Sequence, residues 1–480
     1  MNKPVLSTFS GDYSLLDIKK GMEKFISILL ETERSLQGKK VGILVPQIPN
    51  YLELFLAVNQ LGGIVIPFSY QLRKDDLKAL LDLLDPHIVF TVKEFNGYNF
   101  GDAITQWGKA SQKETIIYLS DNGKNWTERK VIEGKQRPLE TEKVDIIGYS
   151  SGSTGIPKGM MFDTEFIICH AQSIISTLEL NSMDRVYHNV SPCLPYGLFW
   201  FFAGLKSRIQ TITSETFDVP KIVQLIKDKK PTKISSSPSL FRAIYTFAKE
   251  MRALDCFENV ELCSIGGEMI QNDLIDLISE TLHCKLISTY GLSELGFLMY
   301  TPIDLRQGIE WKVIEGVDYR IVNDELLFKV PKIFLGYYKR PDLTKKVLDE
   351  QSWYYTGDIA DINSNNRIVL KGRKKDLIKK GGQSIIPGEI EYVISQHPYV
   401  KQCVVVGIPH PILGEKVVAF IVSEGDLSAQ QLKTFCSNKI ATYKVPDQFK
   451  FINEIPMNNG KIDRLSLKKM IGVYKERNPI

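Results

Sequence analysis

Short apolar runs rich in Val and Ile recur along the first part of the chain, separated by longer stretches with helical periodicity. The clearest runs are Val41–Pro46, Ile64–Ser69, His87–Val92 and Thr115–Ser120. The alternation returns over Lys233–Phe247 and Val260–Leu282. Strands that alternate with helices are typical of βαβ units, whose strands form a parallel sheet. The pattern therefore predicts an α/β fold for the large N-terminal part of the chain.

The pattern changes in the last third of the chain. Residues 319–330 and 367–372 have the shorter, alternating character of antiparallel strands. Further on, the elements predicted are helices over 388–397 and 429–440 and strands over 402–408 and 416–425. We therefore predict a boundary near Lys375 that divides the chain into domains 1–374 and 375–480.

Composition narrows the class of protein without identifying a function. Of the 480 residues, 43% are hydrophobic and 24% charged, which is ordinary for a globular protein and excludes a disordered or collagen-like chain. The 60 Lys and Arg against 56 Asp and Glu leave +4, too even for nucleic-acid or membrane-surface binding. Seven scattered cysteines without a CxxC pair argue against a disulfide framework or a zinc site. Without an apolar leader or membrane-spanning run, we expect a cytoplasmic multidomain enzyme.

The strongest local motif is YSSGSTGIPKGM, Tyr149–Met160, which follows a strand-like run. Its glycines let backbone N–H groups approach an anion, its Ser and Thr hydroxyls donate hydrogen bonds, and Lys158 adds a positive charge. It is not a Walker A loop, because Pro157 and Gly159 stand where that loop needs Gly and then Ser or Thr. A flexible Gly/Ser surface loop is the alternative, which the embedded Pro-Lys-Gly disfavours. The motif predicts a phosphate-binding loop.

Four further segments suit the same chemistry. Glu294, in STYGLSELG, could ligate Mg²⁺ that bridges nucleotide phosphates, or be a solvated loop acid. Asp358, after the Gly turn of YYTGDIA, could accept both hydroxyls of a ribose, or close an Asx-turn. Residues 372–391 place five basic side chains ahead of a Gly-Gly turn, without the aromatic residues of a nucleic-acid surface. Lys461 lies on an Asn-Gly turn, where an isolated lysine is usually solvated.

In order, chemistry and approximate spacing, these five motifs resemble those of the adenylate-forming superfamily of acyl- and aryl-CoA synthetases, adenylation domains and beetle luciferases. The resemblance covers nearly the whole chain, from VGILVPQIPNYLELFLAVNQLGGIVIPFS to YKVPDQFKFINEIPMNNGKIDR. It implies a large domain of βαβ-layered sheets with a small barrel-like portion, and a small mobile α+β C-terminal domain. It also implies the substrates, a small carboxylic acid, ATP with Mg²⁺, and CoA or the phosphopantetheine of a carrier protein, in a monomer or homodimer.

The resemblance further implies a role for each matching position. The phosphate loop would comprise Ser150, Ser151, Gly152, Ser153, Thr154, Gly155 and Lys158. Other nucleotide-binding positions would be Gly267, Glu268, Met269, Ser288, Thr289, Tyr290, Gly291, Ser293, Asp358 and Arg373. The acyl pocket would be lined by His188, Pro195, Tyr196, Gly197, Leu198, Gly266, Gly267 and Leu292.

The resemblance also implies how the reaction is divided between the domains. Thr154 and Glu294 would hold Mg²⁺, and together with Lys158 and Lys461 they would form the catalytic set. Lys375 would be the hinge between the domains. The thiol channel would comprise Lys380, Gly381 and Gly382.

The acid itself is less well defined by the sequence. The stretch His188–Leu205, which matches the pocket helix of relatives, contains aromatic side chains and no acid to pair the ammonium group of an amino acid. An unpaired ammonium in such a pocket is costly, so an aryl acid is favoured, with a fatty acid as the alternative. The acceptor could also be a carrier protein, and a non-enzymatic nucleotide-binding regulator is disfavoured because the charged motif residues are all retained.

Overall fold

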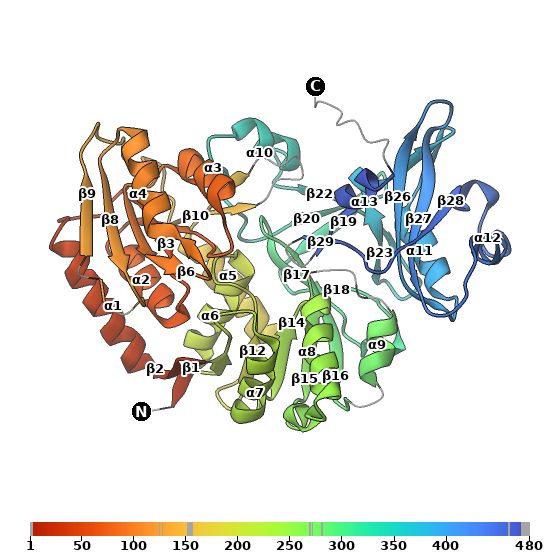
Figure 1. Cartoon of the computed structure of the whole chain (residues 1–480), viewed down its shortest axis with the longest axis horizontal. Helices are drawn as coiled ribbons and strands as arrows, with labels where there is room; N and C mark the ends of the chain where they lie inside the picture. The colour runs from red at the N-terminus through yellow and green to blue at the C-terminus, as the bar shows by residue number, and fades with distance from the viewer. Residues whose placement is uncertain are drawn as a thin grey trace.

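The computed structural model describes residues 3–123, 125–126, 128–150, 157–267, 270, 272–279, 282–458 and 461–471. Within this part of the chain, two large sheets and a small antiparallel sheet precede a separate C-terminal sheet, and helices cover them (Figure 1). This arrangement confirms the predicted α/β fold with a smaller α+β C-terminal part. No helix among these residues has both the length and the apolar character needed to cross a membrane.

The eight-stranded sheet, as the described residues form it, contains the first predicted βαβ units. Its spatial order is β21 (Gly336–Tyr337), β11 (Lys158–Phe162), β10 (Ile146–Ser150), β4 (Ile64–Pro67), β3 (Lys40–Leu44), β5 (Ile88–Val92), β8 (Thr115–Ser120) and β9 (Glu128–Ile132). The connecting helices are α2 (Ile48–Gln60), α3 (Lys74–Leu84) and α4 (Phe100–Ser111). The central strands run parallel, and every residue of β3, β4 and β5 is buried, as expected for a sheet covered on both faces.

The nine-stranded sheet of the described residues adjoins the first. Its order is β18 (Lys312–Val313), β17 (Gly296–Tyr300), β16 (Lys285–Leu292), β15 (Leu262–Gly266), β14 (Lys233–Ser236), β12 (Arg185–His188), β13 (Gln210–Ile212), β1 (Pro4–Thr8) and β2 (Gly11–Ser14). Its helices are α1 (Leu15–Leu30), α5 (Thr164–Thr177), α6 (Pro195–Ser207), α7 (Val219–Lys229), α8 (Pro238–Glu250) and α9 (Asn272–Ser279). Residues 288–292, expected in a loop, belong instead to β16, because β15 and then the antiparallel β17 pair with them.

The predicted antiparallel strands form a four-stranded sheet within the described chain. Its order is β19 (Asp318–Val322), β20 (Glu325–Lys329), β22 (Tyr354–Ile362) and β23 (Ile368–Arg373), and α10 (Pro341–Val347) precedes β22. The turn expected at Gly357 is absent, because Gly357 lies inside β22 with a φ of 71°. A glycine accepts this left-handed conformation, so the strand continues through it and carries Asp358.

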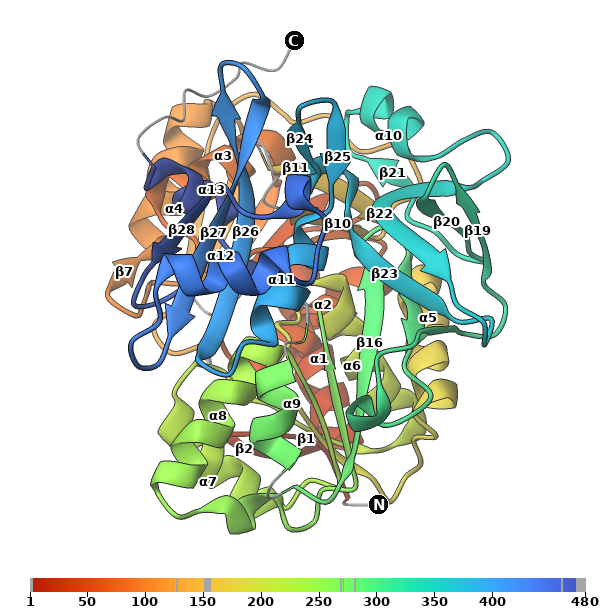
Figure 2. The same cartoon turned by 90° about the vertical axis from the view of Figure 1, so that its right-hand side faces the viewer.

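The C-terminal elements match the predicted helices and strands. They are β24 (Ile378–Lys380), β25 (Gln383–Ile385), α11 (Pro387–Ser395), β26 (Val400–His410), β27 (Gly414–Ser423), α12 (Ala429–Ser437), β28 (Gln448–Phe451), β29 (Met457–Asn458), β30 (Lys461–Ile462) and α13 (Arg464–Lys469). Figure 2 shows α11 and α12 in front of β26 and β27. This sheet has a buried core of its own, with Ile390, Val405 and Ala419 fully buried. The division at residue 375 remains a prediction, and Lys375 lies in the 3-10 helix η3 (Lys374–Asp376) directly after β23.

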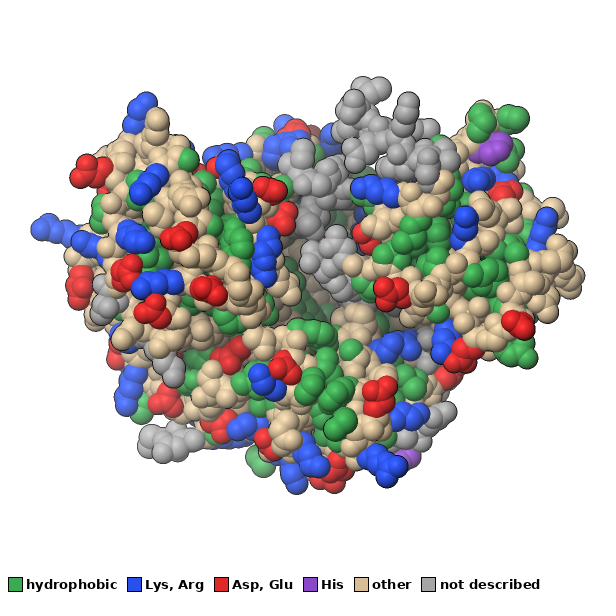
Figure 3. All heavy atoms as spheres, in the orientation of Figure 1, with side chains coloured by type: hydrophobic (Ala, Val, Ile, Leu, Met, Phe, Trp, Pro, Cys, Tyr) green, Lys and Arg blue, Asp and Glu red, His purple; other side chains and the backbone are tan. Residues whose placement is uncertain are grey.

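Minor elements complete the described chain. They are the hairpin β6 (Glu94–Phe95) and β7 (Tyr98–Asn99) and the 3-10 helices η1 (Leu254–Phe257), η2 (Leu305–Gln307) and η4 (Thr442–Lys444). Asp218 caps α7, because its side chain accepts from the backbone N–H of Lys221. Figure 3 shows Lys and Arg interspersed with Asp and Glu over the N-terminal part of this face, in keeping with the even charge balance.

Candidate active site

Asp358 and Arg373 lie opposite each other on the neighbouring strands β22 and β23. The Asp358 side chain is buried, and the Arg373 Nε lies 2.7 Å from its Oδ1. The Tyr290 hydroxyl, which comes from β16 of the nine-stranded sheet, donates to the other carboxylate oxygen. We call these three residues the ribose corner. Two segments near the end of the N-terminal part and one strand from its centre therefore meet at a single carboxylate.

The electrostatics of the ribose corner depend on this pairing. Burial raises the pKa of Asp358 above its ordinary value, and the Arg373 guanidinium opposes that rise. A buried carboxylate keeps its charge only when a cation and hydrogen-bond donors compensate for the lost water. Arg373 and the Tyr290 hydroxyl supply both, and they fix the orientation of the carboxylate.

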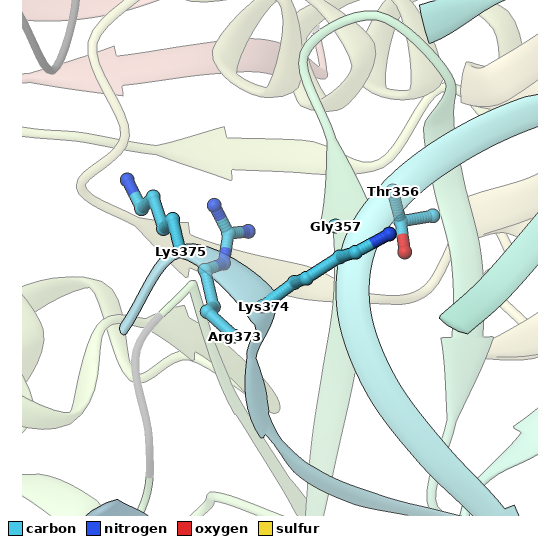
Figure 4. A pocket seen from close by; sticks show the side chains of 5 residues that line it. All are labelled: Thr356, Gly357, Arg373, Lys374 and Lys375. Atoms are coloured by element: carbon cyan, nitrogen blue, oxygen red, sulfur yellow. The ribbon is translucent and has the colours of Figure 1, made fainter. Parts of the chain in front are cut away.

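A cleft of about 330 Å³ borders the ribose corner and is lined by Thr356, Gly357, Arg373, Lys374 and Lys375. Figure 4 shows Arg373 and Lys375 extending to the same side, while Lys374 runs toward Thr356 and Gly357. The predicted hinge residue thus lies on the wall of this cleft.

Glu325 on β20 anchors that wall, and the sequence motifs did not indicate it. One of its carboxylate oxygens accepts from the Lys374 Nζ at 2.8 Å, and the other accepts from the Gly357 N–H at 2.9 Å. The acid thereby holds the backbone next to Asp358.

Lys158, Tyr337 and Glu294 form a second group, which we call the phosphate corner. Lys158 begins β11, whose later residue Met160 pairs with Tyr337 of β21. The Lys158 Nζ lies 5.7 Å from the centre of the Tyr337 ring, and the Tyr337 hydroxyl donates to the Glu294 Oε1 at 2.6 Å. Glu294 is half-buried, in the turn between β16 and β17. It is therefore a held carboxylate and not a freely solvated loop acid.

The phosphate loop itself lies largely outside the described residues. The strands that flank it pair, with Ser150 opposite Lys158. The predicted residues Ser151, Gly152, Ser153, Thr154 and Gly155 fall outside, as do Glu268 and Met269, and only the backbone of Ser150 is described.

The donor set of the phosphate corner fits Mg²⁺ bound with a nucleotide. A single half-buried carboxylate, with one oxygen held by Tyr337, matches the one or two carboxylates that Mg²⁺ takes beside phosphate oxygens. Within the described chain, no group of three or more His, Cys, Asp or Glu side chains could form an all-protein metal site. Glu294 would hold the ion, and Thr154, the other predicted ligand, lies outside the described residues.

Glycines and small polar residues lie between the two corners. A Cβ on Gly266 would come 2.4 Å from the carbonyl oxygen of Thr289, so only glycine fits between β15 and β16 there. Gly267, with a φ of 87°, has open space beside it, and Gly291 passes close to the Gly296 carbonyl. The predicted nucleotide-binding residue Ser288 is buried, and its hydroxyl donates to the Ile265 carbonyl at 2.7 Å, inside the sheet. Ser293 lies half-buried in the turn before Glu294.

The predicted acyl-pocket residues converge around the start of α6. Pro195 is its first residue, and the Tyr196 hydroxyl lies 3.3 Å from the Thr289 Oγ1 of β16. Gly197 is packed against the Ser191 carbonyl, where a Cβ would come within 2.1 Å. The rest of the predicted set is buried or half-buried, namely His188 and Leu198 fully and Leu292 in part.

The residues predicted for the thiol channel lie in the C-terminal part. The Lys380 Nζ is 2.6 Å from the Asp447 Oδ1, so this ammonium group is paired within its own region. Gly381 and Gly382 form the exposed turn between β24 and β25, with φ of 56° and 81°. The backbone of Lys461 pairs with Asn458 across the short β29–β30 hairpin, and its side chain lies outside what the structure describes.

Tyr337, like Glu325, is a functional candidate that the sequence motifs did not indicate. It lies in GYYKRPD, and its local signal is only a tyrosine pair ahead of a basic turn. Its contact with Glu294 spans 43 residues and depends on the pairing of β21 with β11. No local pattern reports such a contact.

The layered sheets fit an enzyme of the adenylate-forming type, and β16 with the turn after it contributes Tyr290 to one corner and Glu294 to the other. The AMP-binding enzyme family model matches residues 17–338, and the model of the AMP-binding enzyme C-terminal domain matches residues 389–461. The chain therefore belongs to the AMP-binding enzyme family, and it is an acid–thiol ligase of the acyl-CoA synthetase class.

Individual relatives differ in acid and acceptor. The chain is 25% identical to the putative acyl-CoA synthetase YngI of Bacillus subtilis, over 94% of this chain and 92% of that protein. It is also 25% identical to the fatty acid–[acyl-carrier-protein] ligase ScoC of Streptomyces coeruleorubidus, over 90% and 86%. The fold matches the anthranilate CoA ligase AuaEII in complex with anthranoyl-AMP with a TM-score of 0.81 and 21% identity, over 98% and 94%.

Proposed function

We propose that the protein activates a carboxylic acid with ATP, releasing pyrophosphate, and then transfers the acyl group from the acyl-adenylate to the thiol of CoA with release of AMP. One observation carries this proposal. β16 and the turn after it supply Tyr290 to the ribose corner and Glu294 to the phosphate corner, four positions apart. A nucleotide held at its ribose by one corner and at its phosphates by the other would present its α-phosphate between them.

In the first step, the carboxylate attacks the α-phosphorus and pyrophosphate leaves. Two anions meet, and charge accumulates on the phosphoryl oxygens in the transition state. Preorganised cations and hydrogen-bond donors stabilise such charge. Lys158 is supplied by the phosphate corner, and Lys461 by the C-terminal hairpin. A Mg²⁺ on Glu294 would add Lewis-acid stabilisation of the phosphate oxygens when bound.

In the second step, a thiol attacks the acyl carbon of the acyl-adenylate, and AMP is the leaving group. We infer that domain 375–480 rotates about Lys375, so that Lys461 leaves and the Gly381–Gly382 turn approaches. Two glycines without side chains allow a narrow pantetheine arm to come close to the backbone. Lys375 lies on the wall of the cleft that borders the ribose corner, directly after β23. This position supports the hinge role, since a change in the backbone dihedral angles there would move the whole C-terminal domain.

We propose an aryl acid as the substrate. The described residues of the pocket stretch 188–205 include buried aromatic rings, and the stretch contains no carboxylate that could pair an amino-acid ammonium group. A flat aromatic acid would stack among such rings. The relatives named above support both aryl and fatty acids, and both CoA and a carrier protein, so acid and acceptor need a direct measurement.

The test is a pyrophosphate-release screen over benzoates, anthranilate, cinnamates, fatty acids and amino acids, each with and without CoA. We expect release with an aryl acid and formation of an acyl-CoA, detected by mass spectrometry. The variant Glu294→Gln should lose this release. Glu310→Gln should keep it, since Glu310 is a half-buried acid that accepts from Asn363 and Asn365 and has no contact with Glu294 or Tyr337 among those described. No release with any acid would overturn the function, and release with transfer only to a carrier protein would overturn CoA as the acceptor.

A further inference from the structure

Three buried polar side chains lie in a row beneath α6. In the parallel register, His188 of β12 is paired with Ser235 of β14, and Ser235 with Ser264 of β15. Residues in register on parallel strands point to the same face of the sheet. His188 is fully buried, and the two serines are 2% exposed. A sheet face that would ordinarily carry Val and Ile beneath a helix carries polar groups here.

Trp200 of α6 packs against this row from the helix side. Its ring is stacked on His188, with centroids 5.9 Å apart and planes at 22°, and the Phe201 ring meets His188 edge to face at 4.8 Å. These contacts show that the row faces α6 and not the opposite side of the sheet. The aromatic rings of α6 and the polar row therefore meet in the buried layer between α6 and the strands β12, β14 and β15, whose labels Figure 1 shows near that of α6.

Most of the polar atoms in this region have no partner in the protein. Among the described residues, neither ring nitrogen of His188, nor the Trp200 Nε1, nor the Ser264 Oγ forms a hydrogen bond. A buried polar group left unpaired costs about 1–3 kcal/mol, and folded proteins pair nearly all such groups. Several together, on both walls of one region, indicate that something outside the protein pairs with them.

The row lies in line with the predicted acyl pocket. Gly266 pairs with Thr289 two residues further along the same strands, and Thr289 is where the Tyr196 hydroxyl reaches. A strand rises about 3.3 Å per residue, so the row lies about 7 Å below that level. This distance is about the length of a benzene ring with one substituent.

We propose that His188, Trp200 and Ser264 bind a neutral polar group, most simply a hydroxyl, at the far end of the acid, so that the enzyme selects hydroxylated aryl acids. This inference rests on the proposed function and deepens it. A hydroxyl both donates and accepts, so it can pair with a ring nitrogen of His188 and with the Trp200 N–H at once. An acid without this hydroxyl would leave the buried nitrogens of His188 and Trp200 unpaired in the complex.

The surroundings of His188 favour a neutral far end over an anionic one. Burial lowers the pKa of His188 to about 3, so the ring is neutral and offers one donor and one acceptor. Within the described chain, the buried cations Lys40 and Arg137 belong to a different cluster, around Tyr338 and Asp85. A second carboxylate on the acid would find no positive charge beneath α6.

The experiment compares acids that differ by one hydroxyl. The pairs are benzoate with 4-hydroxybenzoate, cinnamate with 4-hydroxycinnamate, and octanoate with 8-hydroxyoctanoate, measured as kcat/KM for pyrophosphate release. An acid without the hydroxyl leaves buried polar atoms unpaired, at about 1–3 kcal/mol each, so its kcat/KM should be lower by about tenfold to 10⁴-fold. Trp200→Phe and His188→Phe should reduce the preference toward unity, chiefly by lowering kcat/KM for the hydroxylated acid.

Tyr187→Phe is the matched control. Tyr187 precedes His188 on β12 and is equally buried, but it packs in the cluster on the opposite face. Its loss of a hydroxyl should leave the preference unchanged. If His188→Phe does not fold, as judged by thermal unfolding, Trp200→Phe alone decides the test, since it removes one N–H and little volume.

The outcomes separate the two proposals. No pyrophosphate release with any acid would overturn the proposed function. Turnover of the unsubstituted acids at rates equal to the hydroxylated ones would overturn only the hydroxyl-binding row, as would a hydroxyl preference that survives Trp200→Phe.

Discussion

The ribose corner and the Gly381–Gly382 turn differ in how firmly the structure holds them. In the ribose corner, a buried carboxylate is bound by an arginine from the neighbouring strand and a tyrosine from another sheet. In the turn, two glycines in left-handed conformations are exposed to solvent, with open space around each Cβ position. The lysine beside them pairs with Asp447 of its own region.

This difference assigns different tasks to the two regions. Charged groups that must keep one geometry are fixed by partners from several elements, because reorganising them during the reaction would cost free energy. Groups that must arrive and leave are carried on short turns with few partners. The ribose corner is therefore suited to hold one substrate through both steps, and the C-terminal turns are suited to exchange. The predictions below test this division.

The largest effect is expected for Lys461→Ala. The variant should lose acid-dependent pyrophosphate exchange by about a hundredfold or more, because a preorganised charge opposite the phosphates is removed. It should still convert a supplied acyl-adenylate and CoA into the thioester, measured by chromatography. Full exchange activity in this variant would remove Lys461 from the first step.

Asp358→Asn comes next. Charged hydrogen bonds of this kind contribute about 1.5–3 kcal/mol, so a loss of about tenfold to hundredfold in kcat/KM for ATP is expected. Asp361→Asn is the control, since Asp361 lies on the same strand with an exposed side chain paired to Lys371. An equal loss in both variants would indicate damage to β22 and not to nucleotide binding.

Lys375→Pro should act on the second step. Proline restricts the backbone at the predicted hinge, so thioester formation should slow several-fold while pyrophosphate exchange is nearly unchanged. Lys375→Ala, which keeps the backbone free, separates this effect from loss of the ammonium group. Equal slowing of both steps in the proline variant would contradict domain rotation at this residue.

The smallest effect on activity is expected for a buried carboxyl of α2, which acts on stability instead. Glu53 of α2 is 7% exposed against Gly21 of α1, and burial raises its pKa to about 7. The folded protein then binds more protons than the unfolded chain from about pH 4.5 to pH 7, so the free energy of unfolding falls as pH rises through that range.

Glu53→Gln should remove this fall. The variant should match the wild type near pH 4.5 and be more stable by about 3 kcal/mol at pH 8, measured by urea unfolding. Pyrophosphate release should not change, since Glu53 lies outside the site. A pH-independent difference between the two proteins would contradict the raised pKa.

Several site residues could be predicted because their chemistry is local. Lys158, Glu294 and Asp358 stand in short motifs whose composition suits phosphate, metal and ribose binding. The order of these motifs along the chain favoured those roles, which remain predictions. The partners of these residues could not be predicted in the same way. Tyr337 reaches Glu294 through a strand pairing, and Glu325 reaches Lys374 across 49 residues. The extent of β16 was missed for the same reason, since pairing with β15 and β17 overrides the loop-like composition of STYGLSELG.

The sequence by itself determined the element types, the family and the residues that carry charge, because helical and strand periods and short motifs are properties of neighbouring residues. Only the tertiary structure decided which side chains meet. The meeting of Tyr290 with Asp358 and the alignment of His188 with Ser235 and Ser264 depend on strand order and register. Register is set by packing over the whole sheet. For that reason the polar row beneath α6, unlike the phosphate loop, could not be recognised from the sequence.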